Sequence, residues 1–266
     1  MRKKRKAVTS NTKIAIAFFA FLALLIIISL IFKLTVVLRN GQFDSSRPFV
    51  FSITNGKNVE VVSLSPNPKR IAIFKFDRSI SPAETGRALE IPIDGNISSN
   101  WLDLNWKINS LLLKSATGYN DLKTNLTIVD LLRIIMFAKS TPESSISIIV
   151  VTDKNEEILN QNISYLMNDI SIVKDDQTIQ IINATTVSGL GNKLARLITN
   201  IGGNVIIVAT ETSRKKRSKI LYFDKKTYTV ERLQRILGYE TTEHTGNRMA
   251  DIVIIIGEDN VDLNPF

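Results

Sequence analysis

Two groups of charged residues in this sequence could take part in binding or catalysis. The denser group has five cationic side chains within six consecutive positions, 214–219. Closely spaced cations of this kind attract anionic polymers. The candidate ligand-binding residues are therefore Arg214, Lys215, Lys216, Arg217 and Lys219. The alternative interpretation of this run is a solvated loop that connects two strands.

The second group is the neighbouring pair Asp77 and Arg78, at the end of an apolar run. Adjacent residues of a strand point to opposite faces of a sheet, so these two charges are not expected to act on one ligand. A solvated or mutually paired couple at the end of a strand is the favoured interpretation. Asp77 and Arg78 are therefore weak catalytic candidates.

The composition excludes several other kinds of site. The chain has no cysteine and a single histidine, so disulfides, thiolate metal ligands, cysteine nucleophiles and multi-histidine zinc sites are all excluded. The histidine, His244, lies in the polar run 241–246 and is expected in a solvated loop. The sequence therefore predicts neither a metal site nor a cofactor.

A cluster of arginine and lysine residues precedes the uncharged apolar stretch Ile14–Phe32. At about 1.5 Å rise per residue, a helix of this length matches the ~30 Å hydrocarbon core of a bilayer. A cleaved signal peptide is the competing interpretation, but its apolar core is usually shorter and ends at a small-x-small site, which this segment lacks. We predict a cytoplasmic tail at residues 1–13, an uncleaved transmembrane helix at 14–37 and an extracytoplasmic part from residue 38 onward.

The charge distribution supports this topology. Residues 1–39 contain eight of the 34 lysines and arginines and none of the 25 acidic residues, so the rest of the chain has 26 cations against 25 anions. A nearly neutral extracytoplasmic part offers no general surface for phosphate backbones, and no nucleic acid is expected as a partner. The absence of cysteine from an exported chain is typical of a bacterial surface protein.

The extracytoplasmic part is long enough for two modest domains. The polar stretch 38–47 is predicted to be a linker, and a second polar break lies at 174–176. The resulting domains are 48–173 and 177–260.

The first domain is predicted to be a small mixed α/β region. Apolar runs at 58–64 and 70–76 flank a turn-forming segment and predict a β-hairpin. Helices are expected at 106–117 and 128–138, and a buried strand at 146–151. Thr127 is placed to cap the second helix. The inner face of that helix is expected to carry Ile128, Leu131, Leu132, Ile135 and Met136.

The second domain is more regular. Strands are predicted at 178–182, 205–209, 220–223 and 252–256, with helices at 189–201 and 230–237. The inner face of the first of these helices is Leu190, Leu194, Leu197, Ile198 and Ile201. The order βαββαβ is that of a ferredoxin-like, split βαβ unit, although parallel strand arrangements fit the same order. The predicted fold class is α/β (α+β), with a transmembrane helix at the N-terminus.

Two segments of the second domain carry a resemblance to a known family. The sequences IQIINATTVSGLGNKLA at 179–195 and ADIVIIIGED at 250–259 resemble the C-terminal domain of LytR-CpsA-Psr cell-envelope proteins. That domain opens with a strand, an asparagine-containing turn and a helix, and it closes on a strand flanked by aspartate and glycine. The family-motif positions in this chain are Asn183, Gly189, Leu190, Asp251 and Gly257. Ala184 replaces the glycine that usually follows the asparagine.

The first domain is similar, over fewer residues, to the LytR-CpsA-Psr catalytic domain. The hairpin resembles the opening strands of that domain, and Lys107-Ile108-Asn109 resembles the K-I-N motif that follows them. In the family, an Arg-Asp pair after the hairpin helps to handle a polyprenyl pyrophosphate while glycopolymers are transferred to peptidoglycan. Here the order is reversed, as Asp77-Arg78, and the domain is shorter. The resemblance therefore implies a reduced relative that has lost the reaction.

These observations predict a single-pass cell-envelope protein that acts as a non-catalytic binding or scaffolding factor in cell-wall assembly. Its expected partners are the membrane, an anionic cell-wall polymer and envelope proteins. Two alternatives stay open. One is a weak or specialised phosphotransferase that takes glycopolymers from a polyprenyl-pyrophosphate carrier, and the other is a structural partner of a membrane complex. The enzyme alternative requires Asp77 and Arg78 to converge with Arg87, Lys107 or Arg133 on one cleft.

Overall fold

The protein is represented by a computed structural model that describes residues 10–39, 41–77, 80–152, 163–246 and 249–261. The chain divides into two compact units, Met1–Gly41 and Gln42–Phe266.

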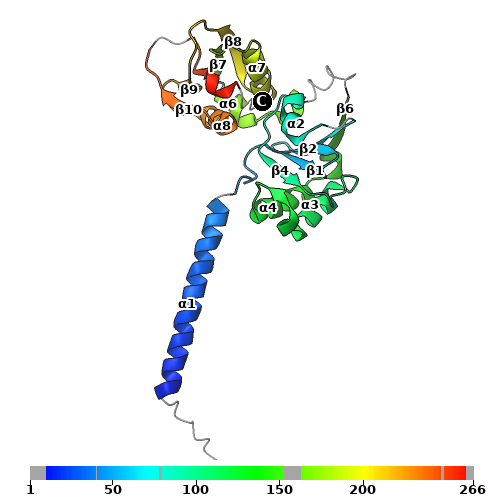
Figure 1. Cartoon of the computed structure of the whole chain (residues 1–266), viewed down its shortest axis with the longest axis vertical. Coiled ribbons are helices and arrows are strands. Elements are labelled where there is room, and N and C mark those ends of the chain that lie inside the picture. Colours follow the sequence, from blue (N-terminus) through cyan, green and yellow to red (C-terminus); the bar gives the residue numbers. More distant parts are fainter. Residues whose placement is uncertain (1–9, 40, 78–79, 153–162, 247–248, 262–266) are drawn as a thin grey trace, which may run out of the picture. The chain divides into compact units, whose positions relative to one another are not determined.

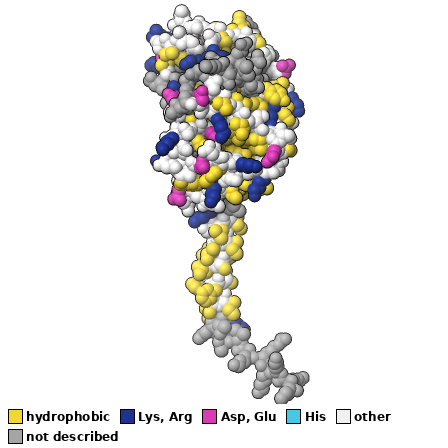
Figure 2. All heavy atoms as spheres, turned by 90° about the vertical axis from the view of Figure 1, so that its right-hand side faces the viewer, with side chains coloured by type: hydrophobic (Ala, Val, Ile, Leu, Met, Phe, Trp, Pro, Cys, Tyr) yellow, Lys and Arg dark blue, Asp and Glu magenta, His cyan; other side chains and the backbone are white. Residues whose placement is uncertain are grey.

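The first unit contains helix α1 (Ser10–Arg39), shown in Figure 1. Its segment Lys13–Lys33 is long and apolar enough to cross a membrane, and none of that segment is buried against protein. Hydrophobic side chains cover the surface of the helix that Figure 2 shows. Such a helix is stable in lipid, because its backbone polar groups are bonded within the helix.

The second unit begins with a six-stranded mixed sheet in the order β5-β4-β1-β2-β3-β6. Its strands are β1 (Phe49–Thr54), β2 (Val59–Pro66), β3 (Lys69–Phe76), β4 (Gly95–Ser98), β5 (Lys123–Thr124) and β6 (Ile146–Val151). The predicted hairpin is confirmed, because β2 and β3 pair in antiparallel fashion. The sequence did not predict β1, which lies between β2 and β4. β6 joins β3 in parallel at the end of the sheet.

Helices pack on both faces of this sheet. α3 (Ile108–Thr117) and α4 (Ile128–Lys139) lie on one face, as Figure 1 shows, and α4 begins at the predicted cap Thr127. α2 (Pro82–Leu89) and residues 163–167 contribute to the core on the other face. Alternate residues of the central strands therefore point into two separate cores. Short 3-10 turns occur at Tyr119–Asp121 and Glu143–Ser145.

The predicted inner face of α4 is only partly right. Leu131 and Ile135 are buried, but Leu132 and Met136 are 51% and 71% exposed. The buried stripe runs through Ile134 instead. α4 carries apolar residues on its outer side as well, and this made the helical pattern in the sequence ambiguous.

The prediction that 146–151 is a buried strand is also corrected. β6 is the terminal strand of the sheet, and its residues Ile148 and Val150 are 62% and 50% exposed. The alternate residues Ile149 and Val151 pack against the second core. A continuous apolar run indicates a strand, but it does not show whether another layer covers both of its faces.

Parts of the predicted linker 38–47 belong to the elements on either side of it. α1 extends to Arg39, and Gln42 and Phe43 already belong to the folded unit. Their backbone nitrogens donate to Oδ1 of Asp130 at 2.8 and 3.0 Å. The Phe43 ring is 1% exposed and packs against two other phenylalanine rings. A shared carboxylate and a buried ring thus fix the chain where it enters the second unit.

The rest of the second unit is built on a five-stranded mixed sheet in the order β10-β9-β11-β7-β8. Its strands are β7 (Thr178–Asn183), β8 (Asn204–Thr210), β9 (Lys219–Tyr222), β10 (Glu240–Glu243) and β11 (Ile252–Ile256). The helices are α6 (Ile170–Asp175), α7 (Leu190–Asn200) and α8 (Tyr228–Leu237), and a 3-10 turn, Glu258–Asn260, follows β11. The sequence did not predict β10, because its residues are polar and it lies at the edge of the sheet.

The α/β class is confirmed, but the ferredoxin-like strand order is not. A split βαβ unit places a third strand between its two helix-connected strands. Here β7 and β8 are direct parallel neighbours, and so are β9 and β10. β11 lies between the two pairs, parallel to β7 and antiparallel to β9. The domain therefore consists of two adjacent βαβ units on either side of a central strand.

α7 and α8 contribute to a single core on this sheet. All five predicted inner residues of α7 are buried, as the spacing of its leucines and isoleucines requires. They pack with the inward residues of β7, β11 and α8. The core also contains Ile172 of α6, so it extends upstream of residue 177.

Two ion pairs join the parts of the second unit that are built on the two sheets. Arg232 of α8 is 2% exposed and donates to both carboxylate oxygens of Asp94, at 2.9 and 3.3 Å. Arg196 of α7 pairs with Glu90, and both side chains are more exposed. Breaking the buried pair is therefore expected to cost more free energy than breaking the exposed pair, because a buried charge that loses its partner is not solvated by water.

Candidate functional site

Three loops meet at one edge of the second sheet. β7, β8 and β11 are mutually parallel, so their carboxyl ends lie at the same edge. The loops that follow them are residues 184–189, 211–218 and 257–260. In open α/β sheets, ligands commonly bind outside the carboxyl ends of the strands. The basic run predicted from the sequence occupies the middle one of these loops.

Asn183 shapes the first loop. It is the last residue of β7 and is 3% exposed. Its Nδ2 donates to the Val187 carbonyl at 2.8 Å, and its Oδ1 accepts hydrogen bonds from the backbone nitrogen and the hydroxyl of Thr185. The side chain is therefore used within the turn, and it is not available to a ligand.

Gly189 and Leu190 continue this loop into α7. Gly189 has φ +85°, a left-handed conformation that side chains disfavour, and it precedes the first residue of the helix. Leu190 is 4% exposed and belongs to the core. Both family-motif residues therefore serve the local fold.

The backbone of the basic loop is held from two sides. The backbone nitrogen of Lys215 donates to the Ala184 carbonyl at 3.1 Å. The carbonyls of Lys215 and Lys216 accept from the backbone nitrogens of Glu258 and Asp259, at 2.9 and 3.3 Å. The loop thus bridges the turns that follow β7 and β11, and its backbone has a defined course.

Ser218 and Asp259 fasten the end of the basic loop. The Ser218 hydroxyl donates to Oδ1 of Asp259 at 2.7 Å, and it accepts from the Gly257 backbone nitrogen at 2.9 Å. The Ser218 backbone nitrogen also donates to the Asp259 carboxylate. Neither role was predicted from the sequence. The available signal was Ser218 itself, which is the one uncharged residue within the basic run.

Gly257 permits this close approach. A Cβ atom at position 257 would lie 2.5 Å from the carbonyl carbon of Arg217 and 2.8 Å from the backbone nitrogen of Ser218. Any side chain here would push the basic loop away from the turn. The family-motif glycine therefore acts directly on the position of the candidate ligand-binding residues.

The side chains of the basic loop point into solvent. Arg214, Lys215, Lys216 and Arg217 are all exposed. Lys215 pairs with Glu211 at 3.4 Å. The side chains of the other three form no hydrogen bond or ion pair with any residue that the structure describes. A fixed backbone thus presents three cations without internal partners, an arrangement suited to an anionic polymer.

Two of the predicted residues lie away from this cluster. Lys219 is half-buried at the start of β9, and its Nζ lies 4.0 Å from Oε2 of Glu240. Asp251 lies at the opposite edge of the sheet, where its Oδ2 accepts from the backbone nitrogen and the hydroxyl of Thr178. Asp251 therefore fastens the amino ends of β7 and β11.

The described residues among those weighed for catalysis, Asp77, Arg87, Lys107 and Arg133, do not share one cleft. Asp77 is exposed, and Arg78 lies outside the described residues. Arg133 donates to the Phe43 carbonyl at 3.0 Å, and Arg87 of α2 lies beside Glu90. Lys107 alone among them lines the groove described next. His244 follows β10 and is exposed, as predicted for a loop histidine.

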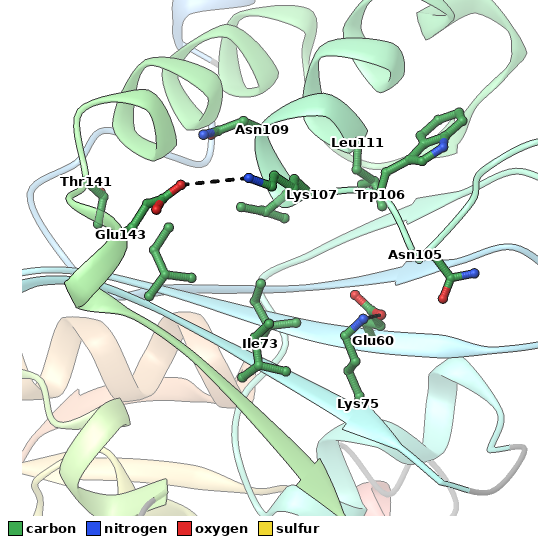
Figure 3. A pocket seen from close by; sticks show the side chains of 13 residues that line it. Glu60, Ile73, Lys75, Asn105, Trp106, Lys107, Asn109, Leu111, Thr141 and Glu143 are labelled. Carbon is green, nitrogen blue, oxygen red and sulfur yellow. Dashed lines mark ion pairs between the residues drawn. The ribbon is translucent and has the colours of Figure 1, made fainter.

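A groove of about 360 Å³ lies over β3 and β6, beside the N-terminus of α3 (Figure 3). It contains the K-I-N segment 107–109, which resembles the family motif. Six apolar or aromatic residues line it: Ile73, Trp106, Ile108, Leu111, Ile146 and Ile148. The groove has room for an apolar group of modest size.

Two ion pairs border the groove. Lys75 and Glu60 are 2.8 Å apart on the sheet, and Glu60 is 7% exposed. Burial raises the pKa of the Glu60 carboxyl, although the hydrogen bond and charge of Lys75 act in the opposite direction. Lys107 and Glu143 point toward one another in Figure 3, 4.0 Å apart, but both are almost fully exposed. The second pair is therefore weak.

A family-model comparison agrees with the motif set of residues 177–260. Residues 176–259 match the family model described as LytR cell envelope-related transcriptional attenuator, so the chain contains a LytR C-terminal domain. A search of curated proteins gave no match. The crystal structure of the transcriptional regulator YvhJ from Bacillus subtilis is similar over 40% of this chain and 83% of that chain, with 13% identity. Its TM-score of 0.31 is too low to support an inference. The LytR C-terminal domain and the apolar N-terminal helix together fit a cell-envelope protein.

Proposed function

We propose that this protein is anchored in the cell membrane by α1 and binds an anionic cell-wall polymer through its basic loop, residues 214–217. It acts as a binding or scaffolding factor in cell-wall assembly and catalyses no reaction. Its N-terminus is cytoplasmic and the unit from Gln42 onward is extracytoplasmic, since basic residues flanking a first transmembrane helix are retained on the cytoplasmic side.

The observation that carries this proposal is the pairing of a fixed loop backbone with free cations. A solvated connecting loop does not require hydrogen bonds to neighbouring turns, yet the backbone of this loop is hydrogen-bonded to Ala184, Glu258 and Asp259. The side chains of Arg214, Lys216 and Arg217 have no polar partner among the described residues. A preorganised cluster loses less conformational entropy on binding than a flexible one, so its cations are better placed to bind repeated phosphate or carboxylate groups.

The phosphotransferase alternative has less support. The apolar groove beside Lys107 is the observation in its favour, because an enzyme of that kind must hold a polyprenyl chain. Against it, Arg87 and Arg133 lie at other places in the fold, and Arg133 is bonded to the Phe43 carbonyl. A binding factor should be indifferent to Asp77→Ala or Lys107→Ala, whereas a transferase should lose product formation. We expect indifference.

Retention on isolated cell walls tests the proposal. In the detergent-solubilised full chain, Arg214, Lys215, Lys216 and Arg217 are changed together to Ser. A matched control removes four exposed lysines elsewhere in the second unit: Lys174, Lys193, Lys225 and Lys226. Both variants lose the same formal charge, so a difference between them reports the position of the charges.

We expect the loop variant to lose most of its retention at low salt and the control variant to keep it. Added salt should weaken the unaltered protein in the same direction, because it screens exposed charges. Equal retention of the two variants would refute the proposed role of the loop and leave it as a solvated connection.

A further inference from the structure

We propose that the outer face of α3 and α4 lies on the headgroup layer of an anionic bilayer, the same bilayer that α1 crosses. This face is defined by the exposed apolar residues Leu113, Leu132 and Met136 and the exposed lysines Lys114 and Lys139 of the two helices, together with the exposed Lys123 of β5 in the segment that connects them. The inference is independent of the basic loop, which belongs to the other sheet.

The first argument is the composition of the face. Leu113, Leu132 and Met136 are 49%, 51% and 71% exposed on the outer sides of their helices. Soluble surfaces rarely gather large apolar residues of this kind without a reason. Apolar side chains interspersed with lysines are typical of surfaces that lie in a membrane interface, where the apolar groups enter the acyl boundary and the cations meet lipid phosphates.

The second argument is the charge of the face. Between Ile108 and Ser140 the chain has three exposed lysines and the partly buried Arg133, against two aspartates. One of the aspartates, Asp130, is fully buried and bonded to the backbone of residues 42 and 43. Asp121 is thus the one exposed acidic side chain on this stretch. The surface that remains is basic and complements an anionic lipid headgroup layer.

The third argument is the length of chain that connects this layer to the membrane helix. α1 ends at Arg39, and Gln42 is already bonded to Asp130 in the first turn of α4. At no more than ~3.6 Å per residue, the two intervening residues allow a separation of about 10 Å between these ends. Arg133 of α4 adds a hydrogen bond to the Phe43 carbonyl at 3.0 Å. The first residues of the second unit are therefore held beside α4, a short length of chain from the end of α1.

Single-cysteine labelling of the full chain tests the inference. The chain has no native cysteine, so Met136→Cys and Met249→Cys each accept one fluorophore. The two methionines are matched, since they are 71% and 76% exposed, but Met249 lies just before β11 in the other half of the unit. The labelled proteins are reconstituted in vesicles of phosphatidylglycerol with phosphatidylethanolamine, or of phosphatidylcholine alone. The neutral quencher acrylamide then reports access from water.

We expect acrylamide quenching of the Met136→Cys label to be at least fivefold weaker in the phosphatidylglycerol vesicles than in phosphatidylcholine, and quenching of the Met249→Cys label to be the same in both. Changing Lys114, Lys123 and Lys139 to Ser should restore access at position 136, since each lysine near an anionic surface strengthens binding roughly fivefold. Equal access in both lipids would overturn the proposal. Protection that persists in phosphatidylcholine and grows with the protein-to-lipid ratio would also overturn it, because the face would then pack against a second copy of the chain.

Discussion

Removal of Asp94 should destabilise the second unit far more than removal of a comparable exposed charge. Arg232 is 2% exposed, and Asp94 receives two of its hydrogen bonds and also one from the Val50 backbone nitrogen. Burial alone would lower the pKa of the Arg232 guanidinium, but the charge and hydrogen bonds of Asp94 outweigh burial and raise it. Arg232 therefore stays charged in Asp94→Ala, without its main counter-ion.

The expected cost follows from this geometry. Breaking a buried pair by removing one partner costs about 3–5 kcal/mol, because an uncompensated charge is left in the interior. The control is Arg196→Ala, which removes the more exposed pair with Glu90 and should cost no more than about 1 kcal/mol. Arg232→Met combined with Asp94→Ala should recover part of the loss, since the uncompensated Arg232 charge is removed, while Arg47, whose Nη1 lies 3.8 Å from Asp94 Oδ1, still lacks its counter-ion.

Urea denaturation of residues 42–266 measures these differences as changes in the free energy of unfolding. The reasoning predicts a large loss for Asp94→Ala, a small loss for Arg196→Ala and partial recovery in the double variant. A loss below about 1 kcal/mol for Asp94→Ala would refute it, because the pair would then behave as a solvent-exposed one.

Three further predictions follow from the anchor, the basic loop and the groove. Met249→Cys should react with a membrane-impermeant thiol reagent in intact cells, and labelling that needs lysed cells would show that the proposed orientation is wrong. Gly257→Ala should lower the free energy of unfolding by about 1–3 kcal/mol and weaken retention on cell walls, because the new methyl group displaces the Arg217 carbonyl. Unchanged retention would show that the position of this turn does not affect binding by the basic loop. The raised pKa of Glu60 means that the folded state holds this proton more tightly than the unfolded state, so stability should fall as pH rises through the ordinary value of 4.5 and the raised one. In denaturation experiments, the stability of Glu60→Gln should lack that part of the pH dependence. Identical profiles of stability against pH for the variant and the unaltered protein would contradict the raised pKa of Glu60.

Local signals in the sequence were enough to predict the elements with strong periodicity. α7 has an apolar residue at each position that must face the sheet, and the β2–β3 hairpin is two apolar runs around a turn. β10 gave no such signal, since Glu240–Glu243 is a polar edge strand. The order of the strands in the sheet could not be predicted from the sequence either. The element order βαββαβ is compatible with parallel strand pairs that are direct neighbours and with pairs that have a third strand between them.

The candidate site was predictable only in part, for a similar reason. The cations of residues 214–217 stand out as a run, but the contacts that fix them do not. Ser218 and Asp259 are 41 residues apart in sequence, and the residue types alone do not indicate that the hydroxyl and the carboxylate form a hydrogen bond. The exposure of Leu132 and Met136 was likewise not predictable, because in the sequence an apolar residue on the outer face of a helix cannot be told from one that faces the core.

The ligand that we propose for the basic loop is an anionic wall polymer. The most direct test measures retention of the unaltered protein on walls from which the anionic polymers have been removed by hydrofluoric acid, with untreated walls as the reference. If the basic loop binds such a polymer, retention of the unaltered protein should fall on the stripped walls to the level of the variant that lacks the four cations of residues 214–217. Undiminished retention on the stripped walls would contradict it.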